Sequence, residues 1–223
     1  MLTIVAVAYL AVAATPGRAS MCSDAYGMSD EIRKAILDKH NELRSLTAKG
    51  LAVNYQGGHA PKAARMLKMS YDCDIEANTM NWIKQCKWGH NSYRERNKWG
   101  QNLYRINAKV NKTSAAVKSV ERWFSELTKK GLNPKDNNKF TNAAFLNAGH
   151  YTQVVWQKSH KLGCAVYWCP QMTYVGCEYS PAGNMRKAVI YDVGEPCKKD
   201  EDCRGDNAFT MENWLKEEMT ISL

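Results

Sequence analysis

The octapeptide Gly149-His150-Tyr151-Thr152-Gln153-Val154-Val155-Trp156 lies where the hydrophobic pattern of this 223-residue chain changes. From Tyr151 onward, short runs rich in Val, Tyr and Trp are separated by turn residues, a pattern typical of β-strands. We predict four strands, over residues 151–156, 163–168, 173–179 and 187–193. The last three lie close enough in sequence to form an antiparallel meander.

Before the octapeptide, apolar residues recur at helical spacing. Ser29 can cap a first helix, whose apolar face would be Ile32, Ile36, Leu43 and Leu46. A second helix is predicted to start at Asp74, with one face formed by Ile75, Thr79, Trp82, Ile83 and Cys86. A third is predicted over residues 114–130, with Gly131 as its stop signal and a face of Val117, Val120, Trp123, Phe124 and Leu127. Helices followed by strands indicate an α+β domain with helices packed on a sheet.

Four further motifs surround the octapeptide in a definite order. They are Cys86-Lys87-Trp88-Gly89-His90, Gly100-Gln101-Asn102-Leu103-Tyr104, Trp123-Phe124-Ser125-Glu126-Leu127 and Cys177-Glu178-Tyr179-Ser180-Pro181-Ala182-Gly183-Asn184. With the octapeptide they resemble the signature segments of the CAP superfamily (cysteine-rich secretory proteins, antigen 5 and pathogenesis-related 1 proteins). The resemblance covers residues 29–193. It is greatest to the venom allergen-like, activation-associated secreted proteins of parasitic nematodes, with insect antigen 5 as the alternative.

The resemblance implies an α–β–α sandwich (CAP domain) with a central antiparallel sheet and a central cleft. We expect this domain over residues 21–193 and a short Cys-stapled C-terminal extension over residues 194–223. Residues 1–20 fit a signal peptide, because their apolar run of about 13 residues is short for a membrane span and small residues follow it. A buried N-terminal helix is the alternative. A secreted, extracellular protein is expected, with no transmembrane segment in the mature chain.

The net charge of +9 is spread along the chain. A solvated surface is the simplest explanation, and adhesion to glycosaminoglycans or anionic membranes is the alternative. No nucleic-acid-binding motif accompanies the charge, so no nucleic acid partner is expected.

The eight cysteines indicate disulfides and an oxidising compartment. Zinc binding by cysteine is the alternative, but no CxxC pair is present. The expected pairs are Cys22–Cys86, Cys73–Cys164, Cys169–Cys177 and Cys197–Cys203, of which the first and last rest on the family resemblance and on proximity. The middle two pairs could instead rearrange around Cys164–Cys177, because these two residues lie on adjacent predicted strands. Asn111-Lys112-Thr113 is a glycosylation sequon, which places Asn111 in an expected exposed loop.

Carried over from the family, the cleft tetrad is His90, Gln101, Glu126 and His150. Gln101 stands where the family pattern has Glu, and it lacks both charge and acid–base capacity. His90 and His150 could hold a divalent metal such as zinc weakly, since a catalytic zinc usually has three protein ligands. No cofactor is required in this interpretation. A structural or ligand-binding cluster is favoured over an enzyme, and His40, His59 and His160 are expected to serve surface or core roles.

The family resemblance also implies lipid binding at two places. A sterol would lie near the loop of residues 131–147, whose candidate contacts are Leu132, Phe140, Phe145 and Leu146. A fatty acid would lie between the first and third helices, although core packing is the favoured explanation of those apolar faces. We therefore expect a secreted, non-enzymatic protein that binds lipids and modulates host immunity. A ligand for a host receptor and a metal-dependent hydrolase are the alternatives.

Overall fold

The computed structural model describes residues 20–55 and 57–196. The expected signal peptide, apart from Ser20, therefore lies outside the described residues, and so does most of the expected extension. The helices are η1 (Ala25–Gly27), α1 (Asp30–Ala48), α2 (Cys73–Ile83), α3 (Lys112–Phe124), α4 (Glu126–Lys129), η2 (Pro134–Asp136) and α5 (Asn142–Val154). The strands are β1 (Ser70–Tyr71), β2 (Gly100–Ile106), β3 (Lys161–Trp168) and β4 (Thr173–Ser180).

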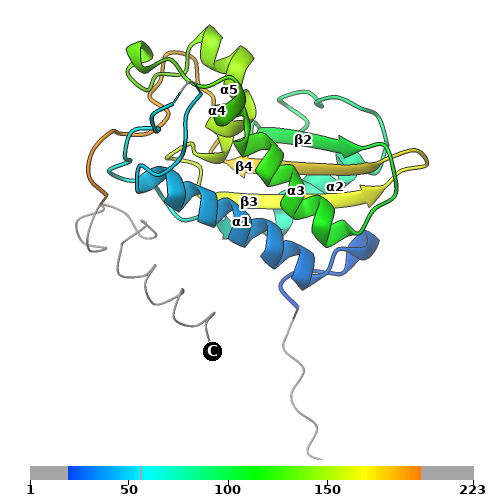
Figure 1. Cartoon of the computed structure of the whole chain (residues 1–223). Coiled ribbons are helices and arrows are strands. Elements are labelled where there is room, and N and C mark those ends of the chain that lie inside the picture. The colour runs from blue at the N-terminus through cyan, green and yellow to red at the C-terminus, as the bar shows by residue number, and fades with distance from the viewer. Residues whose placement is uncertain (1–19, 56, 197–223) are drawn as a thin grey trace, which may run out of the picture.

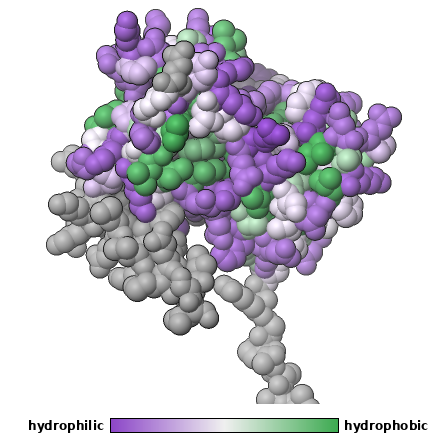
Figure 2. Space-filling model, in the orientation of Figure 1, coloured by the Kyte–Doolittle hydropathy of each residue, from purple (hydrophilic) through white to green (hydrophobic). Residues whose placement is uncertain are grey.

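The elements form three layers, as the sequence predicts. The sheet has the strand order β1-β3-β4-β2, in which only the two-residue β1 pairs in parallel. Helices α1 and α3 lie side by side over one face of the sheet, and α2 covers the other face (Figure 1). The face seen in Figure 1 is mostly hydrophilic, with a hydrophobic patch toward the C-terminal end of α1 (Figure 2). No helix in residues 20–55 or 57–196 is long and apolar enough to cross a membrane.

Local capping sets the helix boundaries. Ser29 caps α1 as predicted, and its hydroxyl accepts from the N–H of Ile32. The second helix begins at Cys73, slightly before the predicted start, because the carboxylate of Asp72 rather than Asp74 caps it. The predicted third helix is divided at Ser125 into α3 and α4. Gly131 ends α4 with φ +74°, where a Cβ would come within 2.6 Å of the Tyr55 side chain.

The prediction of a strand over residues 151–156 is wrong, because this segment belongs to α5 and the turn after it. Ala148 has non-helical angles inside α5, and Glu126 accepts from the backbone N–H groups that follow this break. At the other end, the buried guanidinium of Arg44 donates to the carbonyls of Val154 and Trp156. Both caps come from distant parts of the chain. The local run of Val and Trp therefore predicts a strand where tertiary contacts stabilise a helix.

The prediction of a strand over residues 187–193 is also wrong. This segment makes isolated bridges, Lys139↔Val189 and Ala63↔Val193, rather than a ladder. The third antiparallel strand is instead β2, which pairs with β4 at the sheet edge. No strand was predicted over Gly100–Ile106, since its buried residues Gln101 and Asn102 are polar and break the apolar pattern of a strand.

The disulfide pairs differ from the predicted set. The bonds are Cys22–Cys73, Cys86–Cys169 and Cys164–Cys177, so the predicted pairs Cys22–Cys86, Cys73–Cys164 and Cys169–Cys177 are wrong. The rearrangement around Cys164–Cys177 is confirmed, because these residues are register partners on β3 and β4 with their Cα atoms 4.1 Å apart. The predicted pair Cys197–Cys203 lies outside the described residues.

Candidate functional site

Glu126, the first residue of α4, binds His150 of α5 through both carboxylate oxygens. Its Oε1 lies 2.7 Å from His150 Nδ1, and its Oε2 accepts from the backbone N–H of His150 at 2.8 Å. The imidazole ring of His150 also stacks on Trp123, with a centroid distance of 6.4 Å. The carboxylate therefore fixes both the position and the rotamer of His150, and Nδ1 is held as the donor.

His90 makes the corresponding contact with Gln101 on β2. His90 Nδ1 lies 2.7 Å from Gln101 Oε1, while Gln101 Nε2 donates to Asn91 Oδ1 at 2.9 Å and to Glu178 Oε1 at 3.0 Å. Because the Gln101 amide uses its nitrogen on these acceptors, its oxygen faces His90. Nδ1 of His90 is thus a donor, and Nε2 carries the lone pair of the neutral ring.

The two pairs belong to one cluster. Asn102, next to Gln101 on β2, donates to the backbone carbonyl of His150 at 3.0 Å. Burial lowers the pKa of His90, and the charges of Arg96 and His150 lower it further, while the hydrogen bond to Gln101 opposes them. Both imidazoles are thus anchored through Nδ1, and His150 lies near enough to His90 to influence its pKa.

The donor set suits a weakly held metal rather than a closed metal centre. In the part of the chain that the structure describes, no group of three or more His, Cys, Asp or Glu side chains is placed to hold a metal ion. His90 and His150 each engage Nδ1 with an oxygen acceptor, the arrangement that orients Nε2 of a histidine toward a metal. The two imidazoles are therefore the available protein ligands, and solvent or a bound molecule would complete the coordination of the metal.

Glu178 is a member of the cluster that sequence analysis did not single out. It is fully buried on β4, and its Oε2 has no hydrogen-bond partner within the described residues. Burial raises the pKa of Glu178 to about 7, against the opposing effects of the Gln101 hydrogen bond, the nearby Thr79 hydroxyl and the charge of Arg96. The signal in the sequence is a charged residue inside the otherwise buried strand of the second signature motif.

The predicted sterol loop contributes to an apolar pocket through its first part. The pocket has a volume of about 450 Å³ and is lined by Asn54, His59, Ala60, Pro61, Leu127, Leu132, Asn133, Pro134, Asn137, Asn138 and Val193. Among the four predicted contacts, only Leu132 lines it.

The other three predicted contacts lie elsewhere. Phe140 is 3% exposed and packs edge-on against Trp156 in the core, which explains why it is not a loop contact. Phe145 and Leu146 belong to α5 and are 58% and 71% exposed.

The facing sides of α1 and α3, proposed above as a fatty-acid channel, are part of the packed core. Ile36 on α1 and Ala116 and Val120 on α3 are fully buried, and the two helices contact each other directly. This burial agrees with the alternative of simple core packing.

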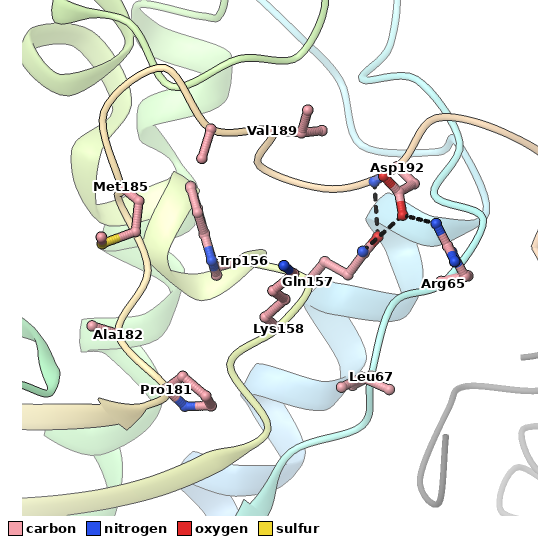
Figure 3. Close-up of a pocket in the computed structure, with 11 residues that line it drawn as sticks. Arg65, Leu67, Trp156, Gln157, Lys158, Pro181, Ala182, Met185, Val189 and Asp192 are labelled. Atoms are coloured by element: carbon pink, nitrogen blue, oxygen red, sulfur yellow. Dashed lines mark hydrogen bonds and ion pairs between the residues drawn. The ribbon is translucent and has the colours of Figure 1, made fainter. Parts of the chain in front are cut away.

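A second cavity, of about 640 Å³, lies beside the turn that follows α5 (Figure 3). Met185, Trp156 and Ala182 line one side of it, and Arg65, Gln157 and Asp192 form a linked polar network on the other (Figure 3). Asp192 accepts from both Arg65 and Gln157 Nε2, so this network ties the segment after β4 to the turn after α5. None of the predicted site residues lines this cavity.

The other histidines and the glycosylation sequon lie outside the tetrad. His40 is buried between the carbonyl of Ile36 and the hydroxyl of Tyr179, and burial lowers its pKa to about 4. His59 lines the apolar pocket, and His160 contacts a neighbouring backbone carbonyl. Asn111 is exposed, as expected, at the end of the loop that precedes α3, and its Oδ1 caps that helix.

Comparison with known proteins gives consistent matches. The model of the cysteine-rich secretory protein family, CAP, matches residues 37–180. The chain is 39% identical over 189 residues to the Ancylostoma secreted protein of Ancylostoma caninum, covering 82% of this chain and 44% of that protein. It thus spans less than half of that relative. It is 32% identical over 174 residues to venom allergen 5 of Vespula flavopilosa, covering 75% of this chain and 83% of that one.

A solved structure, NaASP2 with Zn²⁺, superposes with a TM-score of 0.77 at 43% identity. The match covers 82% of this chain and 97% of that one.

Proposed function

Since the chain belongs to the cysteine-rich secretory protein (CAP) family, we propose that it is a secreted, non-enzymatic protein that binds a sterol and modulates host immunity. Its relationship to nematode venom allergen-like proteins, predicted from the motifs, is confirmed by the matches to hookworm secreted proteins. The observation that carries the proposal is the apolar pocket of about 450 Å³ beside the start of the 131–147 loop.

The shape and lining of this pocket favour a compact apolar ligand. Its volume lies in the range of sites that take drug-sized molecules, roughly 300–1,000 Å³. Leu127, Leu132, Pro134, Ala60 and Pro61 contribute apolar groups to its lining, and four asparagines contribute amide groups. Burial of apolar area contributes about 25 cal/mol per Å², so a rigid hydrocarbon body with one hydroxyl matches this lining. The packed interface of α1 and α3 offers less support for a fatty acid.

Equilibrium binding of a fluorescent sterol tests this assignment. Leu132→Gln combined with Val193→Glu places polar groups in the pocket and should weaken binding at least tenfold. Leu146→Gln is the matched control, because Leu146 is exposed and does not line the pocket. Unchanged affinity in the double variant, with the fold intact by circular dichroism, would reject the pocket as the sterol site.

The anchored histidines His90 and His150 support a second binding function, for a divalent metal. The supporting observations are the two imidazoles anchored through Nδ1 and the zinc in the related structure NaASP2. His90 and His150 would hold the ion, which would supply a positive charge and open coordination positions to a small ligand. Isothermal calorimetry with zinc should give weak binding of one ion per chain, and heat of dilution alone would contradict this part.

Secretion and a host target complete the proposal. The disulfides and the similarity to secreted relatives support an extracellular location. The exposed sequon Asn111 would carry its glycan on Nδ2 while Oδ1 continues to cap α3. Cytokine release from host leukocytes, measured with the parent protein and with the pocket variant, tests whether sterol binding and immune modulation are linked. Activity that survives in the pocket variant would favour direct binding to a host receptor.

A further inference from the structure

We propose that Glu178 is a positioning residue for the cleft: through the Gln101 amide it holds His90 in the tautomer whose Nε2 lone pair is free for a metal. The inference rests on the metal-binding function proposed above, and it explains how the cleft operates with Gln101 in place of a glutamate. Its basis is a chain of hydrogen bonds from β4 through β2 to His90.

The register of the sheet puts the members of this chain together. Gln101 on β2 and Glu178 on β4 are direct partners in the antiparallel ladder, so their side chains share one face. Gln101 Nε2 lies 3.0 Å from Glu178 Oε1, and Gln101 Oε1 lies 2.7 Å from His90 Nδ1. A change at residue 178 therefore reaches His90 through a single amide group.

The orientation of that amide follows from what each neighbour can do. An ionised carboxylate only accepts hydrogen bonds, so Glu178 requires the nitrogen of Gln101 to face it. Asn91, the other neighbour of Gln101 Nε2, carries both an oxygen and a nitrogen and could meet either amide orientation by turning. Glu178 is thus the group that forces Gln101 Oε1 toward His90, and this oxygen in turn requires a proton on His90 Nδ1.

The burial of Glu178 argues against a purely stabilising role. The residue is fully buried, and within the described residues its Oε2 has no hydrogen-bond partner. A buried oxygen without a partner lowers stability, and an uncharged residue of the same shape would avoid burying a charge. Positions of this kind often serve function at the expense of stability. A positioning role therefore predicts that a neutral variant is more stable than the parent, whereas a purely stabilising role predicts that it is less stable.

The test compares the parent protein with Glu178→Gln and with the double variant Asn91→Asp/Glu178→Gln. Glu178→Gln keeps the size of the side chain but can offer Gln101 a donor, so the amide can turn. The double variant supplies a carboxylate at the other neighbour of Gln101 Nε2 and should restore the orientation. Long-range ¹H–¹⁵N NMR at pH 8 reports the tautomer of His90, with its signals assigned from a His90→Gln variant.

We expect the parent and the double variant to hold His90 with the proton on Nδ1. Glu178→Gln should show a mixture of His90 tautomers. Only the tautomer with the proton on Nδ1 can bind zinc through Nε2, so the zinc affinity should fall roughly two- to tenfold, in proportion to the fraction of that tautomer that remains. Glu178→Gln should nevertheless unfold at a higher denaturant concentration than the parent. A His90 tautomer unchanged by Glu178→Gln would overturn the proposal. Failure of the parent to bind zinc would instead reject the metal function, while the tautomer measurement would still decide the role of Glu178.

Discussion

The carboxylate of Glu126 accepts hydrogen bonds from His150 at two atoms, the ring nitrogen Nδ1 at 2.7 Å and the backbone nitrogen at 2.8 Å. One side chain from α4 thus both orients the imidazole and caps the second part of α5 after its break at Ala148. A residue placed in the cleft by its motif is therefore also a structural element of the helix that carries the octapeptide.

We predict that Glu126→Gln lowers the free energy of unfolding by about 1–3 kcal/mol, because the amide nitrogen faces N–H donors that it cannot satisfy. Urea denaturation measures this change. Glu121→Gln, on the exposed surface of α3, is the control and should change stability by less than about 0.5 kcal/mol. Equal stability of the two variants would show that Glu126 does not cap α5.

Phe140 and Phe145 should respond differently to the same substitution. Phe140 packs in the core against Trp156, so Phe140→Ser should destabilise the fold by at least about 3 kcal/mol, the usual cost of removing a buried aromatic ring. Phe145 is exposed on α5, and Phe145→Ser should alter stability little. Thermal unfolding of both variants measures the difference. Similar melting temperatures would contradict the burial of Phe140.

The pH dependence of stability should carry a contribution from Glu178. Its pKa is about 7 in the folded chain against 4.5 for the free side chain, so between these values the folded state binds a proton that the unfolded state releases. Stability therefore falls as pH rises through this window, by up to about 1.4 kcal/mol per pH unit. Glu178→Gln should remove this fall in stability. The free energy of unfolding of the variant should therefore exceed that of the parent by more at pH 8 than at pH 5. A gain independent of pH would contradict the assignment.

Zinc binding should require both histidines and neutral rings. His150→Ala should abolish the calorimetric signal, whereas His160→Ala, outside the cluster, should leave it unchanged. Affinity should fall as pH drops through roughly 6.5, where unperturbed histidine takes up a proton. Since burial lowers the pKa of His90, the His90 contribution should persist to lower pH than that of an exposed histidine. Binding that improves on acidification would contradict imidazole ligands.

The features that sequence analysis predicted correctly depend on local chemistry or on motif order. Ser29 caps α1 with its own hydroxyl, and the runs that became β3 and β4 flank a short turn. Cys164 and Cys177 meet because these strands form a hairpin. The family was predicted correctly because the five motifs keep the family order.

The features that sequence analysis missed depend on contacts between distant segments. Residues 151–154 are helical because Glu126 and Arg44 cap α5 from other helices, and no local pattern reports such caps. The strand β2 lacks the alternating apolar residues that predict a strand. Its residues Gln101 and Asn102 are polar, yet they are buried and hydrogen-bonded. The pairs Cys22–Cys73 and Cys86–Cys169 join segments 51 and 83 residues apart, which only tertiary packing brings together.

Photolabelling with a photoactivatable cholesterol analogue, followed by mass spectrometry of the labelled peptides, tests the central claim most directly. The apolar pocket predicts labels on the peptides that contain Leu132 and Pro134 and on the peptide that contains Ala60 and Pro61, with competition by unlabelled cholesterol. Labels confined to the peptides that contain His90 or His150 would contradict the claim and place the sterol in the cleft.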